Sequence, residues 1–336
     1  MTDNTQPEEK PKPILWGEQL TTSIHSARVA REALIEGILF KKSAHMKYAP
    51  EGIGKSLISL QEAVQGTVEG NLVFGEFLVP KAFNTIYLQM ERPEDESLER
   101  LKTMTAHTPF DPNRFVLDCS FQEFNFKNEK HAKEAVDRIG KIIKATFGKV
   151  DLVKIDPIYP MIPGGLKDDE GAAHIVNFSK NLQYKYECSV DLTHHTNRGQ
   201  KDKDTGERIG KDMYGSGAFL WHCTGIYSIS KSKEGTTLKL EKSSQSNMER
   251  KIDLCFDGES QLSYVKNAQG KISKTDILMN YLKTCKLQEK HITFGEMEQV
   301  SGLSTSFLRG LQGGHLKDKL GFVGKSNTGA YLYKVL

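Results

Sequence analysis

The residues with the clearest chemistry form the run APEGIGKS, which begins at Ala49 and ends at Ser56. The spacing fits the phosphate-loop pattern, with Ala49 in place of the usual first glycine. The run follows a strand-like segment and opens the helix-like LISLQEAVQG, which is the context that this motif requires. We therefore expect the backbone around Gly52 and Gly54 to surround nucleotide phosphates, Lys55 to neutralise the β and γ phosphates, and Ser56 to ligate Mg²⁺.

The motif thus predicts ATP and Mg²⁺ as cofactors. A glycine-rich turn beside a surface lysine is the alternative, and the two flanking elements argue against it. The residues expected to contact the nucleotide are Ala49, Glu51, Gly52, Ile53, Gly54, Lys55, Ser56 and Leu57.

Two acids are candidates for the rest of the site. Asp156 ends the strand-like VDLVKI, where phosphate-loop folds hold the water shell of Mg²⁺, so we expect it to share the metal with Ser56. An aspartate that only starts the turn DPIYP is the alternative. Glu91 follows the apolar strand NTIYLQM, which we expect to run beside the phosphate-loop strand, and it is our candidate catalytic base. The alternative is that Glu91 begins a solvated acidic run, ERPEDESLER, in which Asp95 is another candidate.

A histidine pair, His194 and His195, follows the strand CSVDL. An imidazole there could hydrogen-bond the γ phosphate and sense its loss, and we favour His195 for that role. From spacing alone, a structural histidine is the simpler interpretation.

The elements that must position these residues alternate along the chain. Strand-like runs (IYLQM, RFVLDCS, VDLVKI, CSVDLT and GIYSIS) are separated by amphipathic stretches such as KEAVDRIGKIIKATFG. This alternation predicts an α/β fold with a mainly parallel sheet and helices on both faces. Residues 24–37 carry apolar positions at helical spacing, and residues 236–265 read as antiparallel strands that close the edge of the sheet.

The composition changes beyond the linker-like segment NAQGKISKTD. From there the chain reads as three helices, the last begun by the cap candidate Ser304, and a hairpin that turns at Asn327 to Gly329. This order predicts a small winged-helix-like domain. It carries nine Lys and Arg against five Asp and Glu from Lys274 to Leu336. The cations expected to contact DNA phosphates are Arg309, Lys317, Lys319 and Lys325. A protein-docking module is the alternative.

The bulk properties bound the class of protein. The chain has 336 residues and a net charge of +3, so nucleic-acid binding would need a local patch. No apolar run approaches the length of a membrane span, and the five cysteines form no Cys-x-x-Cys pair. We expect a cytoplasmic protein with a disordered tail (1–13), an ATPase domain (14–265), a linker (266–273) and a winged-helix-like domain (274–336).

The order of these motifs resembles a known family. APEGIGKS, YLQMERP, LVKIDPIYP, DLTHHTNRG and YGSGAFLWHCTGIYSI, over about residues 15 to 265, resemble the AAA_25/RepA-type branch of RecA-like ATPases. That branch contains hexameric replicative helicases of plasmids and related mobile elements. The resemblance implies a RecA-like core, a homo-hexamer acting on single-stranded DNA, and the roles given above to Lys55, Ser56, Glu91, Asp156 and His195.

The chain departs from the family where arginines are expected. Tyr214 and Thr224 stand at two of those positions, so the resemblance supplies no arginine finger. The strand TTLKLEKSS resembles the place where such motors present a Lys and an Arg to the neighbouring subunit, but only Lys242 matches, and Ser244 holds the other position. Arg198 and Arg208 are other candidates.

The sequence therefore favours an ATP-driven DNA motor, with duplex DNA contacted through the C-terminal domain. An ATP-switched DNA-binding or oligomerising protein without unwinding activity is the main alternative, and the missing arginines favour it. A recombination mediator is a third.

Overall fold

The structure is a computed structural model in which the chain divides into two units, Met1–Arg31 and Glu32–Leu336. Only parts of the second unit are described. The predicted disordered tail lies outside these residues, and so does the predicted linker apart from Lys266. The described ranges are 32–126, 128–162, 169–195, 217–232, 235–244 and 250–266, with 278, 281–282, 285–286, 290–301, 304–306, 308–309 and 320–336 in the C-terminal region.

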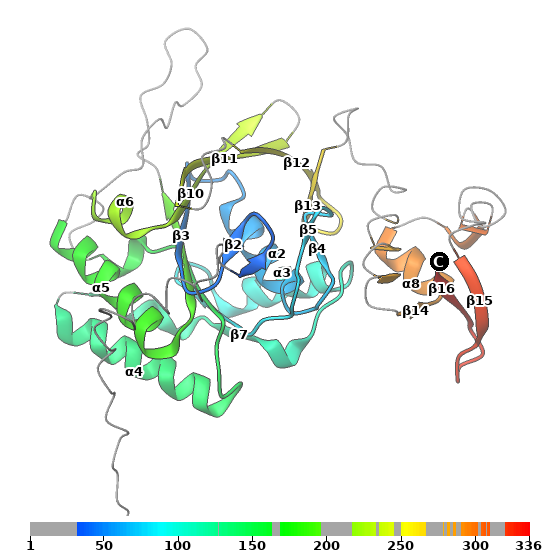
Figure 1. The fold of residues 1–336 in the computed structure, drawn as a ribbon, viewed down its shortest axis with the longest axis horizontal. Coiled ribbons are helices and arrows are strands. Elements are labelled where there is room, and N and C mark those ends of the chain that lie inside the picture. The colour runs from blue at the N-terminus through cyan, green and yellow to red at the C-terminus, as the bar shows by residue number, and fades with distance from the viewer. Residues whose placement is uncertain are drawn as a thin grey trace, which may run out of the picture. The chain divides into compact units, whose positions relative to one another are not determined.

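In the described part of the core, nine strands form one sheet in the order β13-β12-β11-β10-β3-β9-β8-β6-β7 (Figure 1). The six strands from β10 to β7 are parallel, and β11, β12 and β13 continue the sheet as antiparallel strands. This confirms the predicted α/β fold with a mostly parallel sheet. The strands are β3 (Ala44–Ala49), β6 (Thr85–Gln89), β7 (Phe115–Asp118), β8 (Leu152–Asp156), β9 (Ser189–His195), β10 (Gly225–Ser232), β11 (Gly235–Ser243), β12 (Lys251–Asp257) and β13 (Leu262–Val265).

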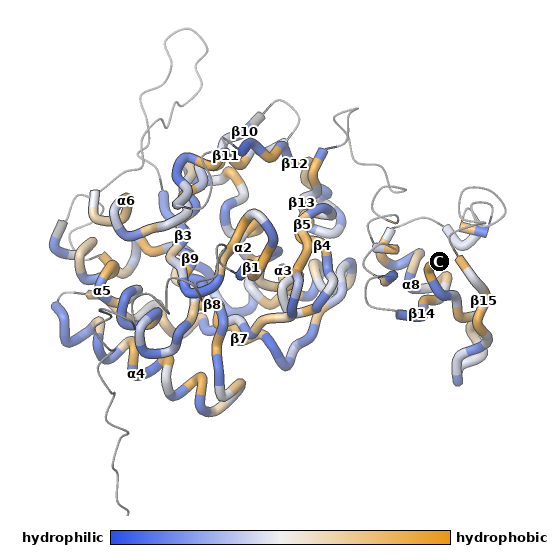
Figure 2. The backbone as a smooth tube through the Cα atoms, viewed as in Figure 1, coloured by the Kyte–Doolittle hydropathy of each residue, from blue (hydrophilic) through white to orange (hydrophobic). Residues whose placement is uncertain are grey.

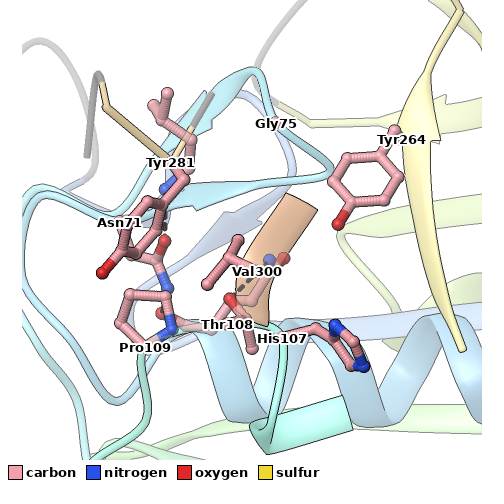
Figure 3. Close-up of a pocket in the computed structure, with 10 residues that line it drawn as sticks. Asn71, Gly75, His107, Thr108, Pro109, Tyr264, Tyr281 and Val300 are labelled. Atoms are coloured by element: carbon pink, nitrogen blue, oxygen red, sulfur yellow. Dashed lines mark hydrogen bonds between the residues drawn. The ribbon is translucent and has the colours of Figure 1, made fainter. Parts of the chain in front are cut away.

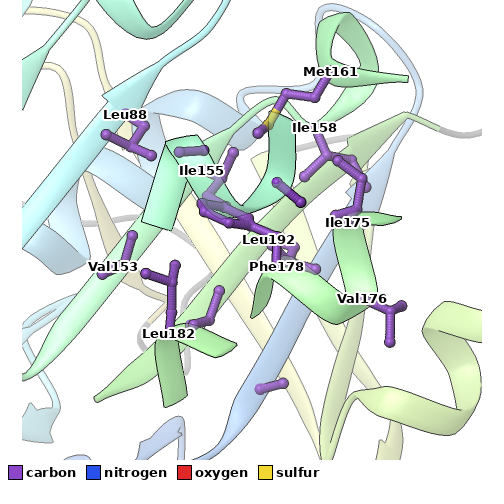
Figure 4. Close-up of a cluster of buried hydrophobic side chains, with 14 of the residues drawn as sticks. Leu88, Val153, Ile155, Ile158, Met161, Ile175, Val176, Phe178, Leu182 and Leu192 are labelled. Carbon is purple, nitrogen blue, oxygen red and sulfur yellow. The ribbon is translucent and has the colours of Figure 1, made fainter. Parts of the chain in front are cut away.

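Helices cover both faces of this sheet because its central strands are buried on both faces. Alternation along β6 divides the core: Ile86 and Leu88 join a cluster with α4 and α5, whereas Tyr87 faces α2. Figure 4 shows the α5 side of the first cluster, and α4 alternates between hydrophobic and hydrophilic residues in Figure 2. The helices of the core are α2 (Lys55–Gln65), α3 (Glu94–Thr105), α4 (Glu129–Ala145), α5 (Asp169–Tyr186) and α6 (Ala218–His222), with 3-10 turns at Pro112–Arg114, Ser120–Glu123 and Tyr159–Met161.

The helix predicted from the apolar spacing of residues 24–37 is wrong for residues 32–37, the part that the structure describes. There Ala33–Ile35 forms β1, which pairs antiparallel with β2 (Leu39–Phe40). The turn between them places Gly37 at φ +68°, a left-handed conformation that glycine adopts without strain. The Gly37 carbonyl accepts hydrogen bonds from Tyr227 (3.2 Å) and Arg250 (2.9 Å). Tertiary contacts therefore override the local periodicity. A second small pair, β4 (Leu72–Val73) and β5 (Phe77–Leu78), is also antiparallel.

Four fully buried charges meet beneath α2, and we call them the ion quartet: Lys47 on β3, Glu62 on α2, Lys154 on β8 and Asp191 on β9. Each lysine contacts both carboxylates, Lys47 at 2.8 Å from each, and Lys154 at 2.7 Å from Glu62 and 2.5 Å from Asp191. Burial disfavours the charged forms of Lys47 and Asp191. Against this effect, Asp191 and Glu62 raise the pKa of Lys47, and Lys154 and Lys47 lower the pKa of Asp191. The quartet is neutral as a group and joins the helix to three strands.

Within Glu32–Leu336, the described residues from 278 onward have a hydrophobic core of their own, and we call this part the C-terminal unit. A three-stranded antiparallel sheet has the order β14-β16-β15, and α8 (Phe294–Ser301) packs with it. The helix begins at a capping box, in which the Thr293 hydroxyl accepts from the Glu296 amide (3.2 Å) and Glu296 accepts from the Thr293 amide (2.7 Å). The predicted hairpin turn is present between β15 and β16. The strands are β14 (His291–Ile292), β15 (Leu320–Lys325) and β16 (Tyr331–Val335).

Replacing Lys154 by Met should lower the free energy of unfolding by about 3–5 kcal/mol, because it leaves Glu62 and Asp191 buried with one cation. Lys239→Met is the matched control, since Lys239 pairs with Glu241 on the exposed surface of β11 and should cost about 1 kcal/mol or less. Urea unfolding followed by circular dichroism measures both. Equal losses would show that the quartet contributes no more than a surface pair.

Candidate nucleotide-binding site

The predicted phosphate loop lies between β3 and α2, at the carboxyl end of a buried parallel strand. Gly52 and Gly54 have φ values of +80° and +93°, so the backbone conformation of the loop depends on glycine at both places. Gly54 is also the N-cap residue of α2, and no side chain caps that end of the helix. The first amides of α2 therefore remain available to an anion.

Lys55 lies inside this loop, with 6% of its surface exposed. Its Nζ donates to the carbonyls of Ala49 (3.0 Å) and Pro50 (2.8 Å) and lies 3.4 Å from Nδ1 of His195. Burial lowers the pKa of Lys55 to about 8, against the opposing attraction of Asp156, Glu91 and Glu51. A phosphate would add the counter-charge that this ammonium lacks.

Asp156 ends β8 and is completely buried. Its Oδ2 accepts a hydrogen bond from the Tyr87 hydroxyl at 2.5 Å, and that hydroxyl also lies 3.4 Å from the Ser56 carbonyl. Burial raises the pKa of Asp156, while Tyr87, Ser56 and Lys55 counteract the rise. Oδ1 has no hydrogen-bond partner among the described residues. An orphaned buried oxygen beside the Ser56 side chain fits a Mg²⁺ site, in which one or two protein oxygens join phosphates and waters.

Lys55, Ser56 and Asp156 line one pocket of about 300 Å³. It collects groups from the carboxyl ends of β3, β6, β8 and β9, which is where α/β folds bind ligands. Ala49 and Ile53, predicted to contact nucleotide, do not line it. Its lining is Glu51, Gly52, Gly54, Lys55, Ser56, Leu57, Glu91, Arg92, Arg100, Asp156, Pro157 and His195.

A second pocket is far smaller, about 20 Å³, which suits roughly one water. Figure 3 shows its lining, in which Thr108 accepts a hydrogen bond from Gln65 (3.1 Å) and Tyr264 and Tyr281 contribute rings. His107 is the one imidazole in the lining, and none of the lining residues is a carboxylate, Lys or Arg. This pocket is too small for a nucleotide, so the larger one is the candidate site.

Glu91 lines the pocket. The prediction that its strand, β6, runs beside the phosphate-loop strand β3 is wrong. β6 lies between β8 and β7, and both β9 and β8 separate it from β3. Order along the chain does not fix order in a parallel sheet, because each crossover can return the chain to either side. The Glu91 carboxylate is exposed and acts electrostatically on Lys55 across the pocket.

Arg92 and Arg100 are pocket residues that the sequence did not single out. Both contact Glu96, which pairs with Arg100 at 3.0 Å. They lie in the run that reads as a solvated acidic face, and α3 folds that run back over the pocket. Each lies four residues from Glu96, and this spacing was the available signal, which on the helix applies to Arg100.

The histidine pair divides between pocket and core. His195, the favoured residue, lines the pocket, and burial together with Lys55 lowers its pKa, so the neutral imidazole is favoured. His194 points to the other face of β9, where its ring lies 5.5 Å from that of Phe219. The alternation of side chains along a strand separates the two.

We expected Lys242 to lie on an edge strand, and this is wrong. β11 lies between β10 and β12 in the sheet order, but β12 pairs with it only from Thr236 to Lys239, and Lys242 lies beyond that pairing. Within the chain its Nζ donates to the Leu220 carbonyl of α6, a group that helix ends leave unsatisfied. Thr224, at a family arginine position, donates from its hydroxyl to the Ala44 carbonyl (2.9 Å). Tyr214, Arg198 and Arg208 lie outside the described residues.

Two of the four predicted DNA contacts can be placed. Arg309 and Lys325 are exposed, and the Lys325 ammonium stacks over the Tyr331 ring at 5.1 Å. Lys317 and Lys319 lie outside the described residues.

A glycine-dependent loop at a helix start, with a lysine inside it and an acid at the end of another parallel strand, defines a P-loop ATPase site. The sequence profile of the AAA_25 family, described as an AAA domain, matches residues 7–201, and the chain belongs to this family. None of the curated proteins matches the chain. Among solved structures, a KaiC-like protein from the hyperthermophilic archaeon Pyrococcus horikoshii OT3 is similar over 72% of this chain and 99% of its own, at 12% identity and a TM-score of 0.46.

Within the described part of the chain, no helix has the length and apolar content needed to cross a bilayer.

Lys55→Ala should abolish measurable binding of Mg²⁺ with a fluorescent ATP analogue, because it removes the cation from the centre of the loop. Lys42→Ala is the control, since Lys42 forms an exposed ion pair with Glu187 away from the pocket. Fluorescence anisotropy reports both affinities. Wild-type affinity in Lys55→Ala would rule out this pocket as the nucleotide site.

Proposed function

We propose that the protein is an ATP-driven DNA motor of the RecA-like kind, a homo-hexameric replicative helicase of a plasmid, phage or other mobile element. The observation that carries the ATPase part is the convergence of Lys55, Glu91, Asp156 and His195 on one pocket. The helicase part rests on the order of motifs shared with the family and on the cations of the C-terminal unit.

Each pocket residue has a role in this proposal. Lys55 neutralises the β and γ phosphates, and the amides at the start of α2 surround them. Ser56 and Asp156 would hold Mg²⁺, partly through water, and the metal would supply charge neutralisation at the phosphates. Glu91, exposed at the pocket, accepts a proton from the attacking water. Arg92 and Arg100 contribute further positive charge from the same subunit.

His195 is suited to report the state of the nucleotide. Its Nδ1 lies 3.4 Å from Lys55, the residue that would face the γ phosphate. A neutral imidazole can accept from that ammonium, and the strength of this contact changes when the phosphate charge leaves. The next residue inward, His194, contacts the core, so a shift at the end of β9 has a mechanical route into the protein.

The C-terminal unit fits a winged helix that engages duplex DNA. Its described part contains a helix, a three-stranded sheet and a hairpin. Lys325 of the hairpin is exposed, and so is Arg309, which lies between the helix and the hairpin in sequence. Such cations favour phosphate contacts, which set affinity without fixing sequence.

The second candidate function is an ATP-switched DNA-binding or oligomerising protein. The observation that favours it is Thr224, whose hydroxyl is committed to the Ala44 carbonyl where the family places an arginine. A strand-displacement assay on forked DNA with ATP separates the two functions. A motor releases unwound strand, whereas a switch changes only how much DNA is bound.

Glu91→Gln should retain nucleotide affinity and lose turnover by a factor on the order of 10² or more, because the amide keeps the shape but removes the base. Asp95→Gln, in the same acidic run, is the control and should retain turnover. Steady-state phosphate release and ATP-analogue binding are the measurements. The base is misassigned if the control loses turnover and Glu91→Gln does not.

Lys242 is proposed to act on the nucleotide of the neighbouring subunit, for which transition-state charge calls for a cation from outside the loop. Lys242→Ala should then bind ATP but hydrolyse it poorly, and Lys239→Ala on the same strand should behave as wild type. Mixing Lys242→Ala with Glu91→Gln should restore part of the turnover, since some interfaces pair an intact Glu91 with an intact Lys242. No recovery in well-exchanged mixtures, with turnover independent of protein concentration, would reject the shared site.

A further inference from the structure

The helix α6 presents an aromatic side chain to solvent. Trp221 is 88% exposed and Leu220 is 47% exposed, whereas Phe219 between β9 and α5 is completely buried. One side of this short helix is therefore part of the core and the other side is open. An indole with so little cover has no role in the packing of the described residues, which marks it as a candidate contact for a partner.

The exposure of Trp221 belongs to a fixed element. The His222 imidazole is hydrogen-bonded to the Ser179 hydroxyl of α5 at 2.8 Å, and Lys242 of β11 donates to the Leu220 carbonyl. The Cys223 amide closes the last turn on the Phe219 carbonyl at 2.9 Å. Because the helix is already fixed, its backbone loses little entropy when the exposed ring binds a ligand, and this suits a stacking platform.

The electrostatic surroundings of α6 are positive. Burial lowers the pKa of the adjacent His222 to about 4, and Lys180 and Lys242 lower it further by repulsion. Both charges that act on His222 from the described residues are thus cations. The helix α6 thus carries an exposed indole in positive surroundings, which fits a ligand that combines flat rings with regular negative charge.

We propose that Trp221 stacks on a base of single-stranded nucleic acid, with the exposed side chain of Lys180 facing its phosphates. The proposal rests on the proposed DNA motor function and assigns it a contact in the ATPase core. Stacking tolerates any base, because every base has a π face, and the cations follow the backbone. Such a contact suits a motor that moves along DNA of any sequence.

The position of α6 also connects this contact to the nucleotide. Phe219 lies against His194, and the next residue on β9, His195, lines the nucleotide pocket beside Lys55. A change at His195 can therefore reach Trp221 through two buried rings, those of His194 and Phe219. We expect the affinity for single-stranded DNA to differ about fivefold or more between nucleotide-free and ATP-analogue-bound protein.

A second copy of the chain is the competing occupant. Two exposed apolar side chains could seat against a neighbouring subunit, but the exposed Lys180 would then need an acidic partner. The positive surroundings of α6 favour the polyanion, and the experiment below separates the two occupants.

Intrinsic fluorescence gives a direct test, because the chain has two tryptophans, Trp16 and Trp221. In the Trp16→Phe protein, Trp221 is the single tryptophan emitter, and oligo-dT should quench it as the base stacks on the ring. Anisotropy of labelled oligo-dT should show about tenfold weaker binding to Trp221→Ala and near wild-type binding to Trp221→Phe. Phe256→Ala, which removes another exposed aromatic on β12, is the matched control and should bind normally. ATPase activity without DNA should be unchanged in all variants.

The outcomes are distinct. Oligo-dT that binds wild type and Trp221→Ala equally, without quenching, would overturn this contact and leave the proposed motor function intact. A wild-type protein that binds no oligo-dT would overturn both. A Trp221→Ala protein with altered oligomeric state by light scattering and unchanged DNA affinity would assign α6 to a subunit interface and reject the proposal. Equal affinity with and without ATP analogue would reject the coupling through Phe219.

Discussion

The ion quartet is the constraint on which the rest of the core depends. Lys47, Glu62, Lys154 and Asp191 are fully buried and mutually paired, so none can leave without stranding an opposite charge in the interior. Apolar packing of α2 tolerates small shifts, but these short contacts fix its depth and rotation on three strands. The helix that carries the phosphate loop is thus fastened to the sheet by charge pairing as well as by packing.

The same elements carry the functional groups at their ends. β3 contributes Lys47 and then continues into the phosphate loop, and β8 contributes Lys154 and then ends at Asp156. β9 contributes Asp191 and then ends at His195. The register in which Lys154 lies opposite Asp191 therefore also sets the relative positions of the acid and the histidine at the pocket. The Tyr87 hydroxyl, from a fourth strand, adds a hydrogen bond to Asp156. The buried ion quartet thus helps to set where the pocket residues Asp156 and His195 lie.

The sequence predicts local features better than neighbours in space. The phosphate loop, the alternating strands and the terminal hairpin follow from spacing and glycine placement, and these elements are present. The position of β6 was wrong because topology, not chain order, decides which strands are adjacent. Arg100 was missed because it lies in a run of charges that reads as solvated surface. The quartet left a signal that was not used, since a lysine inside the apolar run LVKID implies a buried acid as partner. Ala33–Ile35 followed its tertiary partners and not its own periodicity.

The central claim is that the pocket ringed by Lys55, Glu91, Asp156 and His195 binds and hydrolyses ATP with Mg²⁺. An electron cryo-microscopy structure of the chain with Mg²⁺, ADP and beryllium fluoride tests it most directly. The account predicts nucleotide density in this pocket, with the phosphates against Lys55 and the metal between Ser56 and Asp156. It also predicts α2 in place over an intact ion quartet. Nucleotide bound elsewhere, or a metal held without Ser56 and Asp156, would contradict the account.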